Sequence, residues 1–314
     1  MNSPIRGRYA PSPTGGLHLG NARTALVAWL HTRSQGGAFV LRVEDLDSQR
    51  CKKGVYEINL AELQWLGLDW DEGPDLGGDF GPYLQSHRTA HYHAMLAQLR
   101  PWVSPCYLSR KDLHTLASAP HGLIEGYGLA ERALNEALKT AKMAAGKQPS
   151  LRLLGPQTSV AFEDLLMGPQ AFDVGDFVLL RADGEWAYQL AVVADDLAMQ
   201  ISEVVRGDDL LPSTAAQVWL YQLLKRPAPQ FLHLPLLLDP QGIRLSKRSG
   251  ALTLSEILKT GLSCERLLGF FAYSLGLIPA MEALTLPELL TVYSPDKLSR
   301  QPYQLSGDEF GFRF

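Results

Sequence analysis

Cysteine is scarce in this chain of 314 residues, with only Cys51, Cys106 and Cys264. These three residues lie far apart and form neither a CxC nor a CxxC pair. Their number and spacing exclude a disulfide framework and indicate no cysteine-rich zinc site. Because such usage is typical of a reducing compartment, we expect a cytoplasmic location.

Long apolar runs are missing as well. The segment Met1–Gly16 contains two arginines and no apolar core, which excludes a secretory signal peptide. The longest uncharged apolar stretch, Leu267–Met281, is interrupted by glycine and proline and is shorter than the ~20 residues of a membrane helix. We therefore expect no membrane segment and interpret this stretch as a buried helix.

An excess of positive charge is also absent, since the formal net charge is −4. This balance excludes nucleic-acid binding through overall charge and leaves only local basic patches. Lys139, Lys142, Lys147 and Arg152 fit either an RNA-facing patch or an ordinary solvated helix face. With 46% hydrophobic and 20% charged residues, the composition is that of a soluble globular protein of about two domains.

The first residues have the pattern of a strand, a loop, a helix and a second strand. Ile5–Ala10 is extended in character, Pro11–Gly20 is rich in proline and glycine, and apolar residues then recur at helical spacing. Phe39–Val43 follows as an apolar strand. This βαβ unit predicts a parallel sheet with a right-handed crossover and a ligand site at the carboxyl ends of its strands.

The rest of the chain alternates between helical and extended patterns. We expect helices at 55–66, 86–99, 129–145, 264–277 and 286–292, and strands at 176–180, 186–194 and 201–206. The fold class is therefore α/β. We predict that residues 1–100 and 176–250 form the parallel-sheet domain, that 101–175 form an inserted subdomain, and that 251–314 form a small helical region.

Residues 8–21 combine a strand edge, a proline-stiffened turn, glycines and a helix N-terminus. Free N–H groups and the positive end of the helix dipole favour a phosphate there, and His18 and Asn21 can hydrogen-bond to phosphate or ribose oxygens. Taken alone, the pattern also fits Asn21 as a helix cap and His18 as a donor to a loop carbonyl.

A second candidate segment, Gly242–Gly250, has three cations in five residues: Arg244, Lys247 and Arg248. A mobile cationic loop suits a triphosphate, because its charge can stabilise the departing pyrophosphate. Taken alone, the segment also fits an ordinary solvated basic turn.

Together, and in this order, the two segments resemble the signatures of class I aminoacyl-tRNA synthetases. His18-Leu-Gly-Asn21 is similar to the HIGH-type motif and Arg244-Leu-Ser-Lys-Arg248 to the KMSKS-type motif. The glutamyl branch is indicated by Arg8-Tyr-Ala-Pro-Ser-Pro-Thr-Gly15, Leu41-Arg-Val-Glu-Asp45 and Val204-Val-Arg-Gly-Asp208. The resemblance covers the chain to about residue 254. It implies a Rossmann-type catalytic domain with an inserted α/β subdomain and a small C-terminal helical region.

The resemblance implies a site for L-glutamate and a site for ATP, with Mg²⁺ accompanying the ATP. The residues implied for glutamate are Arg8, Tyr9, Ala10, Pro11, Ser12, Glu44, Tyr188 and Arg206. Among them, Arg8 suits the side-chain carboxylate and Glu44 the ammonium group. The residues implied for ATP are His18, Gly20, Asn21, Arg244, Ser246 and Lys247, of which His18, Asn21 and Lys247 are expected to be catalytic.

Each of these positions also has a purely structural interpretation. Arg8 and Glu44 would then form ion pairs with their neighbours, Tyr188 would be a half-buried aromatic residue of a strand, and Arg206 would pair with a nearby aspartate. Asp195-Asp196 lies on a matched segment, and we expect it only to hold a loop.

The length of the chain distinguishes between members of the branch. Only 67 residues follow Lys247, where glutamyl-tRNA synthetases carry a large helical anticodon-binding region, so we expect that domain to be absent. The chain then resembles the truncated glutamyl-Q tRNA(Asp) synthetases. This implies a monomer that activates glutamate with ATP and esterifies it to queuosine in tRNA(Asp). Two alternatives stay open: a truncated enzyme that charges the tRNA 3′ end, and a non-catalytic RNA-binding paralogue.

One segment departs from the family pattern. Many members hold zinc in the inserted subdomain through a CxC pair, a tyrosine and a further cysteine, but this chain has Pro105-Cys-Tyr-Leu-Ser109. Tyr127 is the candidate for the tyrosine, and no cysteine follows it closely. Since structural zinc normally requires four good ligands, we predict no structural zinc.

Overall fold

The computed structural model describes residues 4–109, 112, 128–245, 253–306 and 309. Its largest sheet has six strands in the order β2 (Ala38–Leu41), β1 (Arg6–Tyr9), β8 (Glu203–Gly207), β9 (Gln230–Leu234), β5 (Thr158–Asp164) and β6 (Gly168–Val174). Neighbouring strands are parallel from β2 to β5, whereas β6 is antiparallel to β5. The prediction of an α/β fold with a parallel sheet that starts from a βαβ unit is confirmed.

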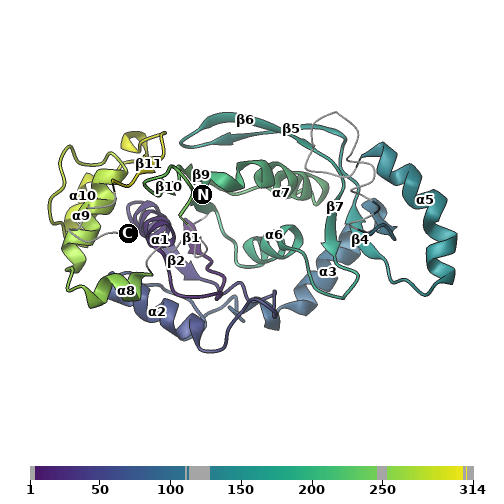
Figure 1. The fold of residues 1–314 in the computed structure, drawn as a ribbon, viewed down its shortest axis with the longest axis horizontal. Coiled ribbons are helices and arrows are strands. Elements are labelled where there is room, and N and C mark those ends of the chain that lie inside the picture. The colour runs from purple at the N-terminus through teal and green to yellow at the C-terminus, as the bar shows by residue number, and fades with distance from the viewer. Residues whose placement is uncertain (1–3, 110–111, 113–127, 246–252, 307–308, 310–314) are drawn as a thin grey trace.

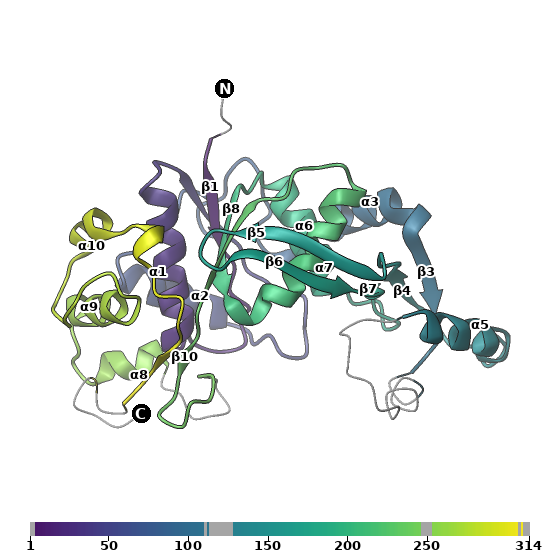
Figure 2. The same ribbon diagram turned by 90° about the horizontal axis from the view of Figure 1, so that it is seen from above.

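Helices lie on both sides of the strands β1 and β8 (Figures 1 and 2). Helix α1 (Leu19–Arg33) packs on one side, where Ala22, Ala25 and Leu26 are fully buried. The helix lies close to β1 at Gly7, where an added Cβ would lie 1.8 Å from Oγ1 of Thr32. On the other side are α6 (Tyr188–Ala198), which packs on α3 (Thr89–Leu99), and α7 (Leu211–Leu223), which packs over β5 and β6.

The predicted strand at 186–194 is wrong, because these residues belong largely to α6. The run from Leu190 to Ala194 is buried at every position, with 0–4% of each residue exposed. A short apolar run that is buried on all sides has the same sequence pattern in a helix as in a strand. Here the helix is enclosed by α3 and α7, so its sequence shows no polar face.

A second, antiparallel sheet contains β3 (Val103–Cys106), β4 (Ser150–Leu153) and β7 (Phe177–Leu180). Helix α5 (Leu129–Ala144) lies beyond it, at the end of the molecule opposite the C-terminal helices (Figures 1 and 2). Strands β5 and β6 lie between β4 and β7 in sequence, yet β5 pairs with β9 of the main sheet. The division of the chain at residues 100, 175 and 250 stays a prediction.

Three further helices pack at the other end: α8 (Leu254–Lys259), α9 (Cys264–Ser274) and α10 (Leu286–Val292). They adjoin α2 (Val55–Trp65) and the short parallel pair β10 (Leu237–Leu238) and β11 (Tyr303–Gln304). In the part of the chain that the structure describes, the 3₁₀ helices are Gln85–His87, Arg100–Trp102, Asp208–Leu210 and Pro295–Lys297. The predicted helices near 264–277 and 286–292 are confirmed.

Helix α1 lies between the main sheet and the C-terminal helices (Figure 2). His31 joins these layers, because its Nδ1 lies 3.1 Å from the hydroxyl of Tyr293 and its Nε2 lies 3.2 Å from Oε2 of Glu203. None of the helices within the described ranges has the length and apolarity needed to cross a membrane.

Candidate active site

The candidate site lies between β1 and β8, where the chain connections to the next strands lead to opposite sides of the sheet. From β1 the chain passes through α1 to β2 on one side, and from β8 it passes through α7 to β9 on the other. The carboxyl ends of β1 and β8 are therefore adjacent strand ends whose connections diverge. Ligands of open parallel sheets bind at such a switch point.

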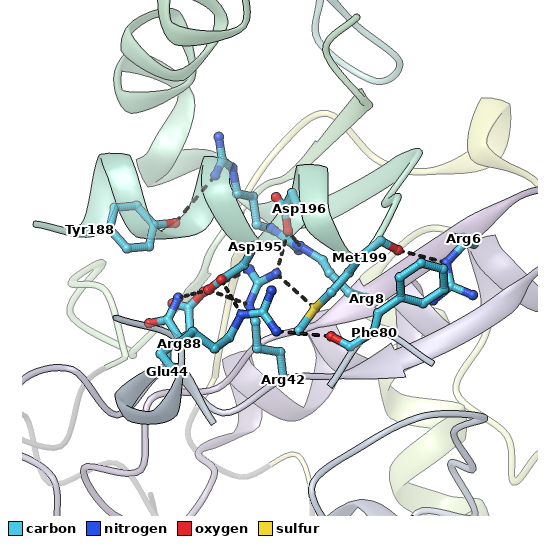
Figure 3. A network of polar contacts seen from close by, with 12 residues as sticks. Arg6, Arg8, Arg42, Glu44, Phe80, Arg88, Tyr188, Asp195, Asp196 and Met199 are labelled. Carbon is cyan, nitrogen blue, oxygen red and sulfur yellow. Dashed lines mark hydrogen bonds and ion pairs between the residues drawn. The ribbon is translucent and has the colours of Figure 1, made fainter. Parts of the chain in front are cut away.

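A buried network of charges occupies this edge (Figure 3). Arg42 follows β2 and has no exposed side-chain surface; its Nη1 lies 2.6 Å from Oδ1 of Asp196, and its Nη2 lies 3.1 Å from Oε1 of Glu44. Arg8 of β1 reaches the same aspartate, with its Nε 3.5 Å from Oδ1 of Asp196. Two of the residues predicted for glutamate, Arg8 and Glu44, are thus brought together through two residues, Arg42 and Asp196.

The two acids in this network titrate in opposite directions. Burial alone would raise the pKa of Asp196, but the Arg42 and Arg8 guanidinium groups hold it below its ordinary value of 3.8. Burial raises the pKa of Glu44 above its ordinary value of 4.5 in spite of the same two arginines. The charge of Glu44 is therefore less well compensated than that of Asp196, and a further cation beside it would be favourable.

Asp195, beside Asp196 on α6, also faces Arg42, whose Nε lies 3.8 Å from its Oδ2, but its closer partners differ from those of Asp196. Its Oδ1 lies 2.5 Å from Nε of Arg88, and its Oδ2 accepts hydrogen bonds from Gln85 at 2.7 Å and from the Tyr92 hydroxyl at 3.0 Å. These contacts fix α6 against the start of α3. The predicted role of the aspartate pair as a loop-holding element therefore describes Asp195 but is incomplete for Asp196.

Sequence reasoning missed Arg42, although a signal for it was present. It is a charged residue within the apolar segment Phe39–Val43, and a charge in such a segment is buried only if it is paired. The spacing did not identify the partners, because Asp196 lies 154 residues further along the chain.

Tyr188 and Arg206 lie together on the opposite side of the site. Nη1 of Arg206 is 3.5 Å from the Tyr188 hydroxyl, and Tyr188 begins α6 with 37% of its surface exposed. Arg206 is buried and donates through Nε to Nε2 of His233 at 3.0 Å and through Nη2 to the Thr214 hydroxyl at 2.6 Å. Its described partners are neutral groups, and the predicted pairing with an aspartate is not among them.

The loop after β1 turns into the first turn of α1. His18 caps this helix, because its Nδ1 accepts a hydrogen bond from the backbone N–H of Asn21 at 3.3 Å. The neutral ring therefore carries its proton on Nε2, which makes Nε2 a donor. Asn21 is not the cap; its carbonyl accepts a hydrogen bond from the Tyr9 hydroxyl at 3.3 Å. Gly20 has no side chain to displace the His18 ring, which lies 3.1 Å from the position of an added Cβ.

The other predicted residues of this loop lie close to the charge network. The carbonyl of Pro11 accepts from the backbone N–H of Glu44 at 3.0 Å, which fixes the loop against the segment after β2. Ala10 is half-buried, Pro11 is buried and Ser12 is exposed. These positions therefore lie beside the charge network, and their role in binding glutamate stays a prediction.

Glu62 of α2, which sequence reasoning did not single out, joins the loop before His18 to the start of α8, the helix that follows the cationic segment. Oε2 of Glu62 accepts from the backbone N–H of Leu17 at 2.7 Å, and Oε1 accepts from the backbone N–H of Ser255 at 3.1 Å. The backbone N–H of Leu254 also donates to the carbonyl of Leu17 at 2.6 Å. The residue before His18 is therefore fixed to the start of α8.

The cationic segment is described only in part. Arg244 forms an ion pair of 2.5 Å with Asp209, which follows β8. Ser246 and Lys247 lie outside the described residues, so their predicted roles rest on sequence.

The four basic residues proposed as a patch near α5 have partners within the chain. Lys139 pairs with Glu136 at 3.4 Å and Lys142 with Asp112 at 3.1 Å. Lys147 donates to the carbonyl of Tyr107, and Arg152 donates to the carbonyl of Asp176 at 3.4 Å. Two of the four charges are thus paired with carboxylates and the other two are held by carbonyls, which favours the interpretation of an ordinary solvated surface over that of an RNA-facing patch.

The segment that replaces the zinc motif is apolar. Cys106 is buried with Leu108, Leu134 and Leu138 around it. Within the described ranges, no three histidine, cysteine, aspartate or glutamate residues gather as metal ligands. Tyr127 lies outside these ranges, and the absence of structural zinc stays a prediction.

Comparisons with known proteins agree with this arrangement. A family model described as tRNA synthetases class I (E and Q), catalytic domain, matches residues 4–273. The chain therefore belongs to this family and is an enzyme of the tRNA synthetase class, as the motifs predict. Within the family it is 50% identical over 96% of its length, and over 96% of the other chain, to a protein of Symbiobacterium thermophilum named Glutamyl-Q tRNA(Asp) synthetase.

Longer relatives are matched over part of their length. The chain is 40% identical to the Glutamate--tRNA ligase 2 of Syntrophus aciditrophicus, with 96% of this chain and 64% of that protein covered. In structure it resembles a glutamate tRNA ligase from Elizabethkingia meningosepticum that was crystallised in complex with its amino acid. The TM-score is 0.85 at 27% identity, covering 98% of this chain and 68% of that one. The predicted resemblance to the truncated glutamyl branch is confirmed.

Proposed function

We propose that the protein activates L-glutamate with ATP to form glutamyl-adenylate and then transfers the glutamyl group to queuosine in the anticodon loop of tRNA(Asp). The relative that matches end to end carries the name of this activity, whereas the glutamate tRNA ligases extend well beyond the matched region. The observation that carries the proposal is that Arg8 and Glu44, of opposite charge, are brought together through Asp196 and Arg42 at the switch point of the sheet.

The charges of this site are suited to glutamate. Arg8 can bind the side-chain carboxylate, because a guanidinium matches a carboxylate in two parallel hydrogen bonds. Its Nε is buried and makes no hydrogen bond within the described residues, although it lies 3.5 Å from Oδ1 of Asp196. Glu44 is the partner for the substrate ammonium group. The raised pKa of Glu44 indicates that its negative charge is incompletely balanced, and the ammonium group would supply the missing positive charge.

The remaining predicted residues complete the amino-acid site. Tyr9, Ala10, Pro11 and Ser12 form its wall along the loop after β1. Tyr188 and the buried Arg206 lie on the opposite side, where Arg206 has a cationic charge available for a carboxylate.

ATP is expected between the two signature segments, with Mg²⁺ on its β- and γ-phosphates. His18, Gly20 and Asn21 offer a helix N-terminus and the Nε2 donor of His18, and no acid lies in the first turn of α1. Arg244, Ser246 and Lys247 supply the opposite side, where Lys247 would stabilise the pyrophosphate as it departs.

Two transfers follow without a protein nucleophile. The α-carboxylate of glutamate attacks the α-phosphate of ATP, which forms the mixed anhydride and releases pyrophosphate. A hydroxyl of queuosine then attacks the glutamyl carbonyl, which forms the ester and releases AMP and a proton. The protein contributes alignment and stabilisation of the developing charge.

The proposed location is the cytoplasm, where ATP and tRNA are both present, and the proposed state is a monomer.

The test is ATP–pyrophosphate exchange with glutamate, without and with tRNA, followed by transfer of labelled glutamate to tRNA(Asp). We expect exchange with glutamate alone and label in the anticodon-loop fragment after nuclease digestion, provided that the tRNA carries queuosine. Exchange that requires tRNA, with label on the 3′ adenosine, would instead identify a conventional charging enzyme.

The variant Lys247→Ala separates catalysis from RNA binding. Loss of adenylate formation with retained binding of tRNA supports the proposed mechanism. No exchange by the unmodified protein under either condition, with tRNA binding intact, would favour a non-catalytic paralogue.

A further inference from the structure

Arg206 is a buried cation that is held by neutral groups. Only 5% of its surface is exposed, and its described hydrogen-bond partners are His233, Thr214 and Tyr188. Among the described residues no carboxylate is in direct contact with this guanidinium, which is costly for a buried charge, so the arrangement favours the arrival of an anion. How this cation keeps its orientation before an anion arrives depends on the residues behind it.

Asp164 and His233 lie directly behind Arg206, on β5 and β9, and neither side chain is exposed. Oδ2 of Asp164 lies 2.6 Å from Nδ1 of His233 and accepts from the backbone N–H of His233 at 3.1 Å. Oδ1 of Asp164 accepts from the backbone N–H groups of Leu166 and Met167 at 3.0 and 2.8 Å. The carboxylate is therefore fixed by the backbone on both of its oxygens.

The position of the imidazole proton follows from these contacts. Nε of Arg206 can only donate, so Nε2 of His233, 3.0 Å away, must accept. The single proton of the neutral ring is then on Nδ1, where it is donated to Asp164. Burial, which outweighs the effect of Asp164, lowers the pKa of His233 below its ordinary value of 6.5 and so favours this neutral form.

The same contacts determine the plane of the guanidinium. Nε is held by His233 and Nη2 by the hydroxyl of Thr214 at 2.6 Å, while the guanidinium carbon lies 5.3 Å from the centre of the Phe231 ring. A planar group held at two of its nitrogens cannot rotate, and its Nη1 edge is directed to the Tyr188 hydroxyl at the site.

We propose that Asp164 and His233 are positioning residues that orient Arg206 to bind a carboxylate of the amino-acid substrate. The inference rests on the proposed function, because it requires that glutamate binds at this edge of the sheet. Asp164 selects the tautomer of His233, and His233 in turn fixes Arg206. Neither residue touches the substrate.

The experiment compares His233→Leu with His233→Gln. Leucine removes the acceptor for Nε of Arg206, whereas the glutamine side-chain oxygen can still accept there. The loss of a hydrogen bond to a charged group predicts a rise of roughly 10-fold to 100-fold in KM for glutamate in His233→Leu. We expect KM for ATP to stay within about twofold, and His233→Gln to recover most of the glutamate affinity because it retains the acceptor.

A matched control is His31→Leu. His31 is also a buried histidine beside a carboxylate, Glu203, but it faces α10 and lies outside the charge network of the site. This variant is expected to lower the melting temperature without a selective change in KM for glutamate. Equal losses of glutamate and ATP affinity in His233→Leu, or equal losses in the leucine and glutamine variants, would overturn the positioning role.

Direct calorimetric titration with glutamate keeps the two proposals separable. If the unmodified protein binds glutamate but shows no exchange, the proposed function fails, and weaker binding to His233→Leu still supports the positioning role. If exchange occurs and both His233 variants bind glutamate like the unmodified protein, the positioning role fails alone. No binding of glutamate to the unmodified protein would overturn both.

Discussion

Nη1 of Arg42 lies 2.6 Å from Oδ1 of Asp196, and this ion pair connects the end of β2 to α6 inside the molecule. Asp196 also faces Arg8, while Arg42 also faces Glu44, so one buried pair carries both of the charges proposed to bind glutamate. The stability of the fold and the positions of the site residues therefore depend on the same contacts. This dependence predicts how stability and activity change together.

Replacing Arg42 with glutamine is expected to destabilise the fold strongly. The change leaves the carboxylates of Asp196 and Glu44 without their principal cation, and breaking a buried pair in this way costs roughly 3–5 kcal/mol. Urea unfolding monitored by tryptophan fluorescence measures the loss. Arg50→Gln is the control, because the Arg50 side chain is 74% exposed and its ion pair with Asp47 is 4.0 Å long. A similarly small effect of both substitutions would contradict the buried network.

Glu62→Ala is expected to weaken the binding of ATP more than that of glutamate. The alanine leaves the N–H groups of Leu17 and Ser255 without their acceptor and so removes one of the contacts that hold the residue before His18 to α8. We expect KM for ATP to rise about 10-fold, because an unsatisfied buried donor costs about 1–3 kcal/mol, and KM for glutamate to change little.

Glu256→Ala provides the comparison for that substitution. Glu256 forms the capping box of α8 with Thr253. Its loss weakens the start of α8 but leaves the Glu62 carboxylate that accepts from the N–H of Leu17. An equal rise of KM for ATP in the two variants would show that only the stability of α8 matters.

Gly20→Ala is expected to separate activity from stability. Alanine has a higher helix propensity than glycine by up to about 1 kcal/mol, and Gly20 lies in the first turn of α1. The added Cβ, however, would lie 3.1 Å from Cε1 of His18 and 3.2 Å from its Nδ1, so the ring must shift. We therefore expect an unchanged or higher melting temperature together with slower ATP–pyrophosphate exchange. A variant that is both stable and fully active would show that the position of the His18 ring is unimportant.

The parts of the fold that depend on local spacing were predictable from sequence. The helix beginning near His18 and the parallel strands on either side of it follow from apolar periodicity and from the proline- and glycine-rich loop between them. The prediction of a strand over Leu190–Ala194 was wrong because burial on all sides removes the polar face by which a helix is recognised in a sequence. Apolar periodicity distinguishes a helix from a strand only when one face of the element is exposed to solvent.

The parts of the site that depend on distant pairing were not predictable in this way. Asp164 and His233 are 69 residues apart, and neither belongs to a recognisable motif. The motifs identified the residues expected to touch substrate, such as Arg8 and Arg206, because a ligand imposes a recurring local pattern. The residues that hold them, Arg42 and His233, are selected by the packing of strands that meet only in the folded sheet.

The neutral state of His233 predicts a dependence of stability on pH. The pKa of His233 is lowered in the folded protein because the ring is buried. Asp164 opposes this shift, whereas the charges of Arg206 on β8 and Arg8 on β1 add to it. The neutral hydroxyl of Thr214 also contacts the ring. Asp164, whose pKa is also lowered from 3.8, stays ionised throughout the range concerned. Well above pH 6.5 the ring is neutral in both the folded and the unfolded chain, so it contributes no slope there.

Below that value the unfolded chain takes up a proton that the folded chain does not, and the free energy of unfolding falls as the pH falls, by at most about 1.4 kcal/mol per pH unit. Urea unfolding at pH 7.5 and pH 5.5 measures this slope, and comparison with His233→Gln removes the contribution of the other histidines, which are present in both proteins. We expect the unmodified protein to lose more stability between the two pH values than His233→Gln does. Equal losses would mean that His233 is protonated as readily in the folded chain as in the unfolded one, and the imidazole could not then be the acceptor that fixes Arg206.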